Sequence, residues 1–320
     1  MSLGYTYRIS QYLPEEWDVR GGVRRDPLWR SDRGPVEAAH VDAVARFAAE
    51  VGADRFAIRE PHVYFSGLNP DEVPLGGESC FAQIFGPRLA GLVDGAVVDL
   101  HGAQLIVQML LRGSVDGWCR LETDDRMSVH VWDQSVYIGT SGPCPAAVAA
   151  SAAAGLHVCE VPWSPMDPDR PDAFFIWETL EPADEAFWAD VHELIRRWGP
   201  VMLREEAAWT RWHRLTIDHP RVDVRARSRL SIERDLPELD MTEVRAGVPD
   251  VEGIGWLTWV RSDGTALQCC IEGDQVPDLD QLLGDAVRAD WQAVTEMDAE
   301  IALLEAVVPD SDGVIRARWQ

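Results

Sequence analysis

Lysine is missing from this chain of 320 residues, and its 29 basic side chains are all arginines. They stand against 54 acidic side chains, which gives a formal net charge of −25. Phosphate contacts need a basic face, so this charge argues against nucleic acid as a partner. It favours a basic protein as a partner, because opposite charges attract and steer association. GC-rich coding is the simplest explanation of the arginine preference, whereas 14 tryptophans and six cysteines fit poorly with adaptation to high salt.

Long apolar runs are missing as well. No stretch of about 18 apolar residues is available to cross a bilayer, and residues 1–8 lack the basic start and apolar core of a secretory signal. We therefore expect a cytoplasmic protein with no membrane partner. Hydrophobic residues make up 46% of the chain, which is enough for packed cores. A length of 320 residues favours two domains.

Motifs of common catalytic and cofactor sites do not occur, including G-x-S-x-G, the P-loop, G-x-G-x-x-G and H-E-x-x-H. The six cysteines contain no C-x-x-C pair, so neither a zinc knuckle nor a thioredoxin-type pair is indicated. His213, Asp218 and His219 lack the spacing of ligands on one helix. Residues 310–313 begin like a calcium loop, but the chain ends before the loop's last ligand position. We expect no metal and no cofactor.

Regular structure is most clearly indicated in residues 127–161. Residues 127–132 alternate between apolar and polar side chains, as a half-buried strand does, and residues 135–139 predict a second strand. Residues 144–154 are small and apolar and predict a helix that begins near Pro143. Gly155 ends it, and residues 156–161 predict a strand. This stretch therefore contains a strand–helix–strand unit.

Similar reasoning along the whole chain predicts an α+β protein of two ferredoxin-like α/β sandwich domains of the βαββαβ type in tandem. We expect an N-terminal domain over residues 1–162, a linker rich in Pro and Asp over residues 163–172, and a C-terminal domain over residues 173–320. The helices and strands expected in each half are as follows. In the first half we expect strands at 5–9, 55–59 and 117–122, and helices at 36–51 and 99–111. In the second half we expect strands at 173–177, 201–204 and 229–232, helices at 182–198, 205–215 and 278–307, a hairpin of 254–260 with 265–271, and a closing strand at 314–319.

Cys144 is the sharpest catalytic candidate, because free amide groups at a helix start lower the pKa of a thiol. A catalytic cysteine also needs a base, usually histidine. His130 and His157 stand on the flanking predicted strands, but no known motif joins either of them to Cys144. His213 is a further candidate within a stretch rich in Trp. A packing role for Cys144 at the start of the helix is the simpler interpretation.

Acidic clusters with nearby tryptophans suggest a binding surface, because Trp is a common anchor in protein interfaces. The candidates are Asp124, Asp125, Trp118 and Trp132 in the first half, and Asp235, Glu238 and Asp240 in the second. The simpler interpretation is that each acidic cluster is a solvated loop or a helix start.

Composition and motifs together favour a binding protein over an enzyme. The concrete hypothesis is an acidic, cytoplasmic, immunity-type inhibitor that binds a basic toxin or nuclease. The alternative is an enzyme or small-molecule binder with a site between the two domains that uses Cys144, His130, His157 or His213. A third possibility is a subunit of a larger assembly whose acidity is only compositional.

Overall fold

The computed structural model describes residues 3–13, 31, 33–65, 67–113, 117–165, 181–248, 254–272, 277–293 and 302–316. The chain forms two compact units. Unit 1 contains Met1–Tyr64, Gly76–Glu178 and Arg318–Gln320, and unit 2 contains Phe65–Leu75 and Thr179–Ala317. Among the described residues, no helix is both long and apolar enough to span a membrane.

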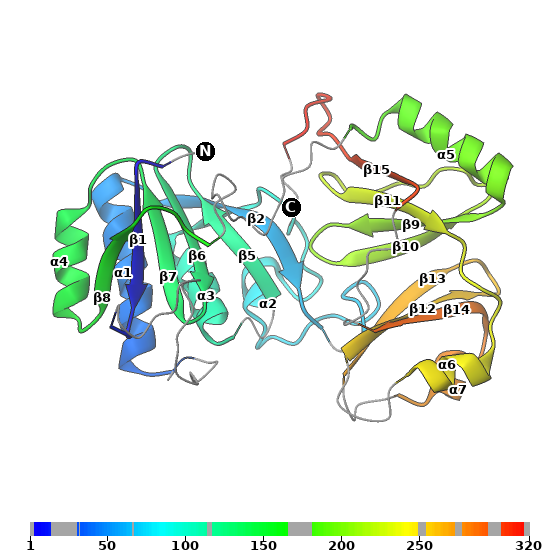
Figure 1. The fold of residues 1–320 in the computed structure, drawn as a ribbon, viewed down its shortest axis with the longest axis horizontal. Coiled ribbons are helices and arrows are strands. Elements are labelled where there is room, and N and C mark those ends of the chain that lie inside the picture. Colours follow the sequence, from blue (N-terminus) through cyan, green and yellow to red (C-terminus); the bar gives the residue numbers. More distant parts are fainter. Residues whose placement is uncertain are drawn as a thin grey trace. The chain divides into compact units, whose positions relative to one another are not determined.

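Unit 1 is built on a seven-stranded sheet whose neighbouring strands are all antiparallel (Figure 1). The strand order is β4-β2-β5-β6-β7-β1-β8. The strands are β1 (Tyr5–Ser10), β2 (Arg55–Val63), β4 (Val97–Asp99), β5 (Gly117–Glu122), β6 (Met127–Trp132), β7 (Ser135–Thr140) and β8 (His157–Val161).

The described residues of unit 1 form the helices α1 (Pro35–Val51), α2 (Cys80–Phe85), α3 (Leu100–Leu111) and α4 (Pro145–Ala153). Their ends follow local chemistry. Gly52 ends α1 with φ of 69°, a conformation that glycine adopts without a steric penalty. Asp99 caps α3 by accepting a hydrogen bond from the Gly102 N–H at 2.8 Å. The strand–helix–strand unit predicted for residues 135–161 is present as β7, α4 and β8, with β1 paired between the two strands.

The two faces of this sheet differ in chemistry. One face packs against α1, α3 and α4 (Figure 1) and carries fully buried apolar side chains, including Phe56, Leu121 and Ile138. The alternate positions of the same strands carry buried polar side chains such as Arg8 and Arg120. The core of unit 1 therefore lies between the sheet and its helices.

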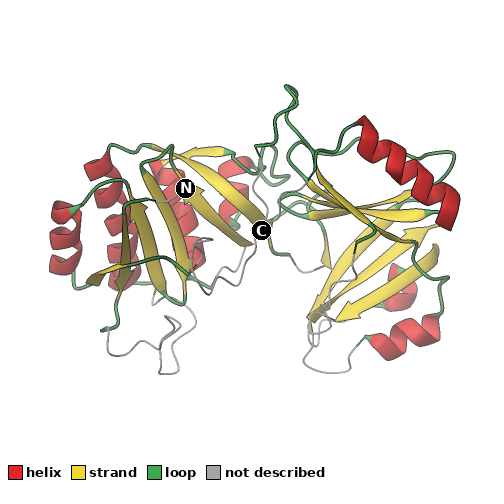
Figure 2. Ribbon diagram, turned by 45° about the horizontal axis from the view of Figure 1, so that its top comes forward, coloured by secondary structure: helices red, strands yellow, loops and turns green. Residues whose placement is uncertain are grey.

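Unit 2 contains two four-stranded sheets, with strand orders β10-β9-β11-β15 and β14-β12-β13-β3 (Figure 2). The strands of the first sheet are β9 (Val201–Glu206), β10 (Thr210–Leu215), β11 (Arg229–Arg234) and β15 (Leu304–Val307). Those of the second are β3 (Gly67–Leu68), β12 (Ile254–Arg261), β13 (Ala266–Glu272) and β14 (Ala286–Ala293). Helix α5 (Glu185–Trp198) covers the first sheet, and α6 (Met241–Gly247) and α7 (Leu279–Leu282) lie against the second (Figure 1).

Both units combine helices with antiparallel sheets, so the α+β class is confirmed. The tandem ferredoxin-like arrangement is not. A βαββαβ domain has one four-stranded sheet, whereas unit 1 has seven strands in one sheet and unit 2 divides its strands between two sheets. The boundary predicted at residues 163–172 stays a prediction, because most of that segment and the strand predicted at 173–177 lie outside the described residues.

Two predicted helices are wrong. Residues 201–215 form the β9–β10 hairpin instead of a strand followed by a helix. Trp212 and Leu215 point to opposite faces of β10 and enter separate apolar clusters. In the described part of residues 278–307, which leaves out 294–301, α7 is the only helix. Val287, Ala289 and Trp291 alternate with polar residues, which is the period of the strand β14 that forms there.

The hairpin predicted around Asp263 and Gly264 is confirmed as β12–β13, with Val260 paired to Ala266. Gly264 has φ of 89°, which explains why glycine follows the aspartate in this turn. At the C-terminal end, Val314–Arg316 form no strand, and the remainder of that predicted element lies outside the described residues.

Candidate functional site

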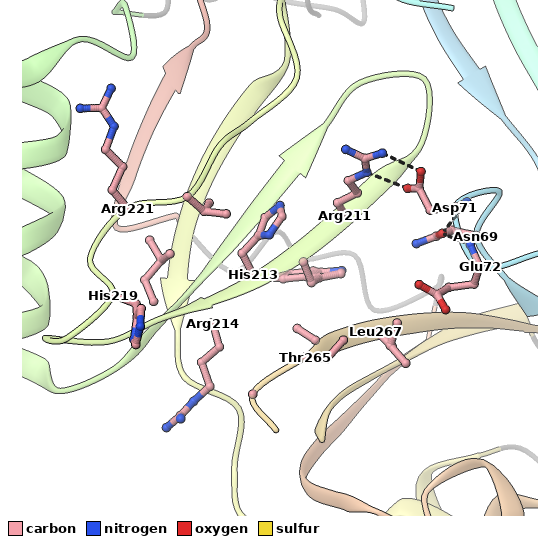
Figure 3. A pocket seen from close by; sticks show the side chains of 15 residues that line it. Asn69, Asp71, Glu72, Arg211, His213, Arg214, His219, Arg221, Thr265 and Leu267 are labelled. Carbon is pink, nitrogen blue, oxygen red and sulfur yellow. Dashed lines mark hydrogen bonds and ion pairs between the residues drawn. The ribbon is translucent and has the colours of Figure 1, made fainter. Parts of the chain in front are cut away.

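A pocket of about 550 Å³ lies in unit 2 beside strand β10 (Figure 3). Its lining comes from three places: β10 with the loop after it, the β12–β13 turn, and the segment around Asp71. All five consecutive residues from Arg211 to Leu215 contribute. Successive side chains of a strand point to opposite faces, so a pocket that touches all five must follow the outer edge of β10.

His213 lies in the middle of this pocket (Figure 3), held by a buried carboxylate. Its Nε2 lies 2.8 Å from Oε2 of Glu205, whose side chain is fully buried. Glu205 also accepts hydrogen bonds from the backbone N–H of Arg225 at 2.9 Å and from its Nε at 2.6 Å. Burial by itself would raise the pKa of Glu205, but His213 and the charge and hydrogen bonds of Arg225 lower this pKa to about 2.

Glu205 is therefore a carboxylate at neutral pH, and a carboxylate only accepts hydrogen bonds. The proton between the two groups must then be carried by Nε2 of His213. In the neutral ring this leaves Nδ1 as a hydrogen-bond acceptor and a base. A carboxylate that fixes the tautomer of a histidine is the arrangement found in many catalytic dyads.

The arginines around the pocket are neutralised by carboxylates. Arg211 donates two hydrogen bonds of 2.6 Å to Asp71, as the dashed lines in Figure 3 show. The Nε1 of Trp209 donates to the same carboxylate at 2.7 Å. Arg214 makes a two-point pair with Asp235 at 2.8 and 2.9 Å.

Arg221, the third arginine in the lining, pairs with Glu185 at 2.7 Å. The pocket consequently presents ion pairs rather than free cations. Beside them, the indole Nε1 of Trp212 is buried and meets no hydrogen-bond acceptor in the described part of the chain.

Cys144 does not have the surroundings of a nucleophile. It is buried at the cap position of α4, where its N–H donates to the Tyr7 hydroxyl at 3.2 Å and its thiol lies 3.6 Å from the Gly142 carbonyl oxygen. Burial raises the pKa of the thiol, the opposite of the lowering expected from the helix start. Neither candidate histidine is among these contacts, and the packing role fits better.

The two histidines predicted as bases for Cys144 have other surroundings. His130 stacks on the ring of Tyr137 with centroids 5.1 Å apart, and its Nε2 lies 3.2 Å from the hydroxyl of Ser164. Burial, helped by the charge of Arg120, lowers the pKa of His130 to about 3, so the ring is neutral. His157 is half-buried on β8, opposite Ser10.

The predicted binding residues of unit 1 fall at two ends of one hairpin. Asp124 and Asp125 are exposed in the turn between β5 and β6. Trp118 is the second residue of β5 and Trp132 is the last of β6, so both lie at the opposite end of the hairpin from the turn. Trp132 is 42% exposed and Trp118 is half-buried. The structure therefore does not bring these acids and tryptophans into one cluster.

The predicted binding residues of unit 2 have mixed roles. Asp235 is mostly buried and lies between Arg214 and Arg288, the latter at 3.4 Å. Asp240 caps α6 by accepting a hydrogen bond from the N–H of Thr242 at 2.7 Å. Glu238 is exposed and remains available to a partner.

A buried ionic cluster in unit 1 was not anticipated from the sequence. Glu60 interrupts β2 at an irregular position with φ of 50°, a conformation that is costly for a residue other than glycine. Its carboxylate pairs with Arg120 at 2.8 Å, and its N–H donates to Asp94 at 2.7 Å. Burial raises the pKa of Glu60 to about 7, although Arg120 opposes the shift. The sequence signal is the run Arg59-Glu60-Pro61, which breaks an apolar alternation with two charges and a proline.

Within the described residues, no group of three or more His, Cys, Asp and Glu side chains is placed to hold a metal ion. Comparison with protein-family models, curated proteins and solved structures finds no match to this chain.

Proposed function

We propose that this chain is an acidic binding protein whose partner is a basic protein, for which an immunity-type inhibitor of a basic toxin or nuclease is the concrete form. The observation that carries the proposal is the uneven charge. The sequence of unit 2 contains 31 acidic and 14 basic side chains, a formal charge of −17 out of the −25 of the whole chain. Such a field accelerates encounter with a cation and is weakened by salt.

Helices α6 and α7 lie against the second sheet of unit 2 (Figure 1), and exposed carboxylates lie at and near their first residues. Asp240 and Asp278 begin these helices, and Glu238 and Glu243 are exposed beside α6 and in its first turn. Arg245 pairs with one further acid of the group, Asp280. This leaves a surplus of negative charge that a basic surface would complement.

The proposal places the chain in the cytoplasm. All six cysteines are free thiols, and five of them are buried. Free thiols persist in a reducing compartment, where a network of disulfides is not needed for stability.

Paired substitutions test which unit binds. Glu238→Gln with Glu243→Gln removes two charges of unit 2 without touching a helix cap. Asp124→Asn with Asp125→Asn removes two charges of unit 1, and Asn tolerates the positive φ of residue 125. The partner that co-purifies with the chain from its host is identified, and its association rate is measured for each variant. We expect a two- to fivefold slower rate for the unit 2 pair and less than 1.5-fold for the unit 1 pair. A reversed order, or a partner that is not basic, contradicts the proposal.

A second candidate is binding or turnover of a small molecule in the pocket beside β10. The Glu205–His213 pair favours it, because a fully buried carboxylate orients an imidazole that faces the pocket. The buried N–H of Trp212 would add a donor for an acceptor group. A ligand from a metabolite screen whose binding is lost in His213→Ala but kept in His219→Ala would support this candidate. Equal binding to both variants would speak against it.

A further inference from the structure

We infer that an extended segment of the basic partner binds along the outer edge of β10 and extends the first sheet of unit 2 by one strand. This inference rests on the proposed function and deepens it, since it names how the partner docks. It starts from the position of β10, which ends the sheet order β10-β9-β11-β15 among the described strands.

None of the described strands pairs with the outer edge of β10, so its outward backbone groups can form hydrogen bonds with another strand. β10 is antiparallel to β9 through all six of its residues. In such a pair every second residue directs its N–H and C=O away from the neighbour. An exposed strand edge of this kind is a template for another strand, and several protein domains bind extended peptides in this way.

The pocket lies along that edge and not over one face of the sheet, because Arg211 to Leu215 all line it. Five residues at about 3.3 Å each give a length of ~16 Å. That length suits a peptide of four to five residues in extended form. A compact small molecule needs fewer points of contact along a strand.

The opposite wall is Gly264 to Leu267, which contains the first residues of β13. The short strand β3 pairs with β13 only at Cys269 and Cys270, so the start of β13 is not covered by β3. The pocket is therefore a groove bordered by the edge of β10 on one side and by the start of β13 on the other. β10 supplies the main-chain groups that pair with an extended segment, because β10 and β13 pack too closely for one strand to pair with both.

The negative charge of unit 2 favours a basic segment as the occupant of the groove. Arg211, Arg214 and Arg221 are each paired with a carboxylate, so every arginine among the described residues that line the groove is neutralised. The surrounding unit carries a formal charge of −17 and repels an acidic segment. An extended basic segment is attracted by the whole unit and is held at the groove by main-chain pairing.

A matched pair of peptides tests the inference on the full chain. The probe is a nine-residue peptide of alternating Val and Arg. Its control has the same sequence with every second amide N-methylated, which removes the donors on one edge and keeps the charge. Binding is measured by calorimetry, and backbone amide exchange is followed by NMR.

We expect the unmodified peptide to bind at least 10-fold more tightly than its N-methylated form and to slow amide exchange within Arg211–Leu215. Thr265→Trp, which fills the groove from an exposed position, should weaken binding at least fivefold. Ser262→Trp lies on the same turn outside the groove and should leave binding unchanged.

Equal binding of both peptides, abolished by salt, would overturn strand addition and leave the acidic binding function intact. Slowed exchange elsewhere in unit 2 would overturn the location. Absence of binding by either peptide would contradict both the docking mode and the attraction of unit 2 for basic segments.

Discussion

At the scale of single residues, Glu205 is the most consequential group of unit 2. Its side chain is fully buried and joins His213 to Arg225. Removing one member of a buried ionic group leaves the other charge without a partner, which is more costly than losing a surface pair.

Glu205→Gln should therefore lower the free energy of unfolding by about 3 kcal/mol at pH 7, measured by urea titration. Glu206→Gln, which changes the next and more exposed carboxylate, should cost less than about 1 kcal/mol. Because the folded-state pKa of Glu205 lies near 2, below its ordinary value, its stabilisation is present above about pH 4.5 and declines as the pH falls toward 2. The difference between wild type and Glu205→Gln should shrink over that interval. A difference that is constant with pH would show that the charge of Glu205 is not its source.

Glu60 should show the opposite dependence on pH, because burial raises its pKa to about 7. The folded state then binds a proton more tightly than the unfolded state, so the contribution of Glu60 to stability falls as the pH rises from about 4.5 to 7. Glu60→Gln removes this titration. The loss of stability between pH 5 and pH 7.5 should be smaller in Glu60→Gln than in the wild type by about 1–3 kcal/mol. Parallel stability curves for the two proteins would contradict a raised pKa.

The candidate site was predictable only in part at this scale. His213 could be singled out from the sequence, but Glu205 could not, because a helix was expected where the β9–β10 hairpin places the two side chains together. For Cys144, the local position was predictable but the surroundings were not. Its position at the helix start was correct, whereas its surroundings depend on contacts with residues as distant as Tyr7.

At the scale of elements, helix caps and turns were the features whose positions the sequence predicted correctly. Asp99 before α3, Gly52 after α1 and the Asp263–Gly264 turn each act within a few residues, so the sequence alone locates them. Strand β10 was missed although its partner β9 directly precedes it in a hairpin, because residues 205–215 were expected to form a helix. Strand β14 was missed because its partner lies far along the chain. β14 pairs with β12, and that pairing decides between a helix and a strand.

The cap of α3 gives a direct test at this scale. Asp99 is exposed, and its side chain accepts the N–H of Gly102. Asp99→Ala should lower the free energy of unfolding by about 1 kcal/mol, because this N–H loses its acceptor. Asp99→Asn keeps an acceptor oxygen and should cost less than half as much. Equal losses in chemical denaturation of the two variants would show that capping is not the role of Asp99.

At the scale of the whole molecule, net charge is the property that follows most directly from the sequence. The two units have different sheets, and unit 2 carries most of the negative charge. The α+β class followed from local patterns, but the division into one seven-stranded sheet and two four-stranded sheets depends on pairings between distant strands. The net charge can be predicted without knowing these strand pairings, because composition alone sets it. Its electrostatic field acts over distances of about 10 Å at moderate salt.

The most direct test of the central claim is the association rate of the full chain with its co-purified partner, measured by stopped flow from 20 to 500 mM salt. An acidic protein that binds a basic partner should associate at least 10-fold more slowly at the highest salt, while the dissociation rate changes little. An association rate that is independent of salt would contradict the claim that negative charge on this chain recruits its partner.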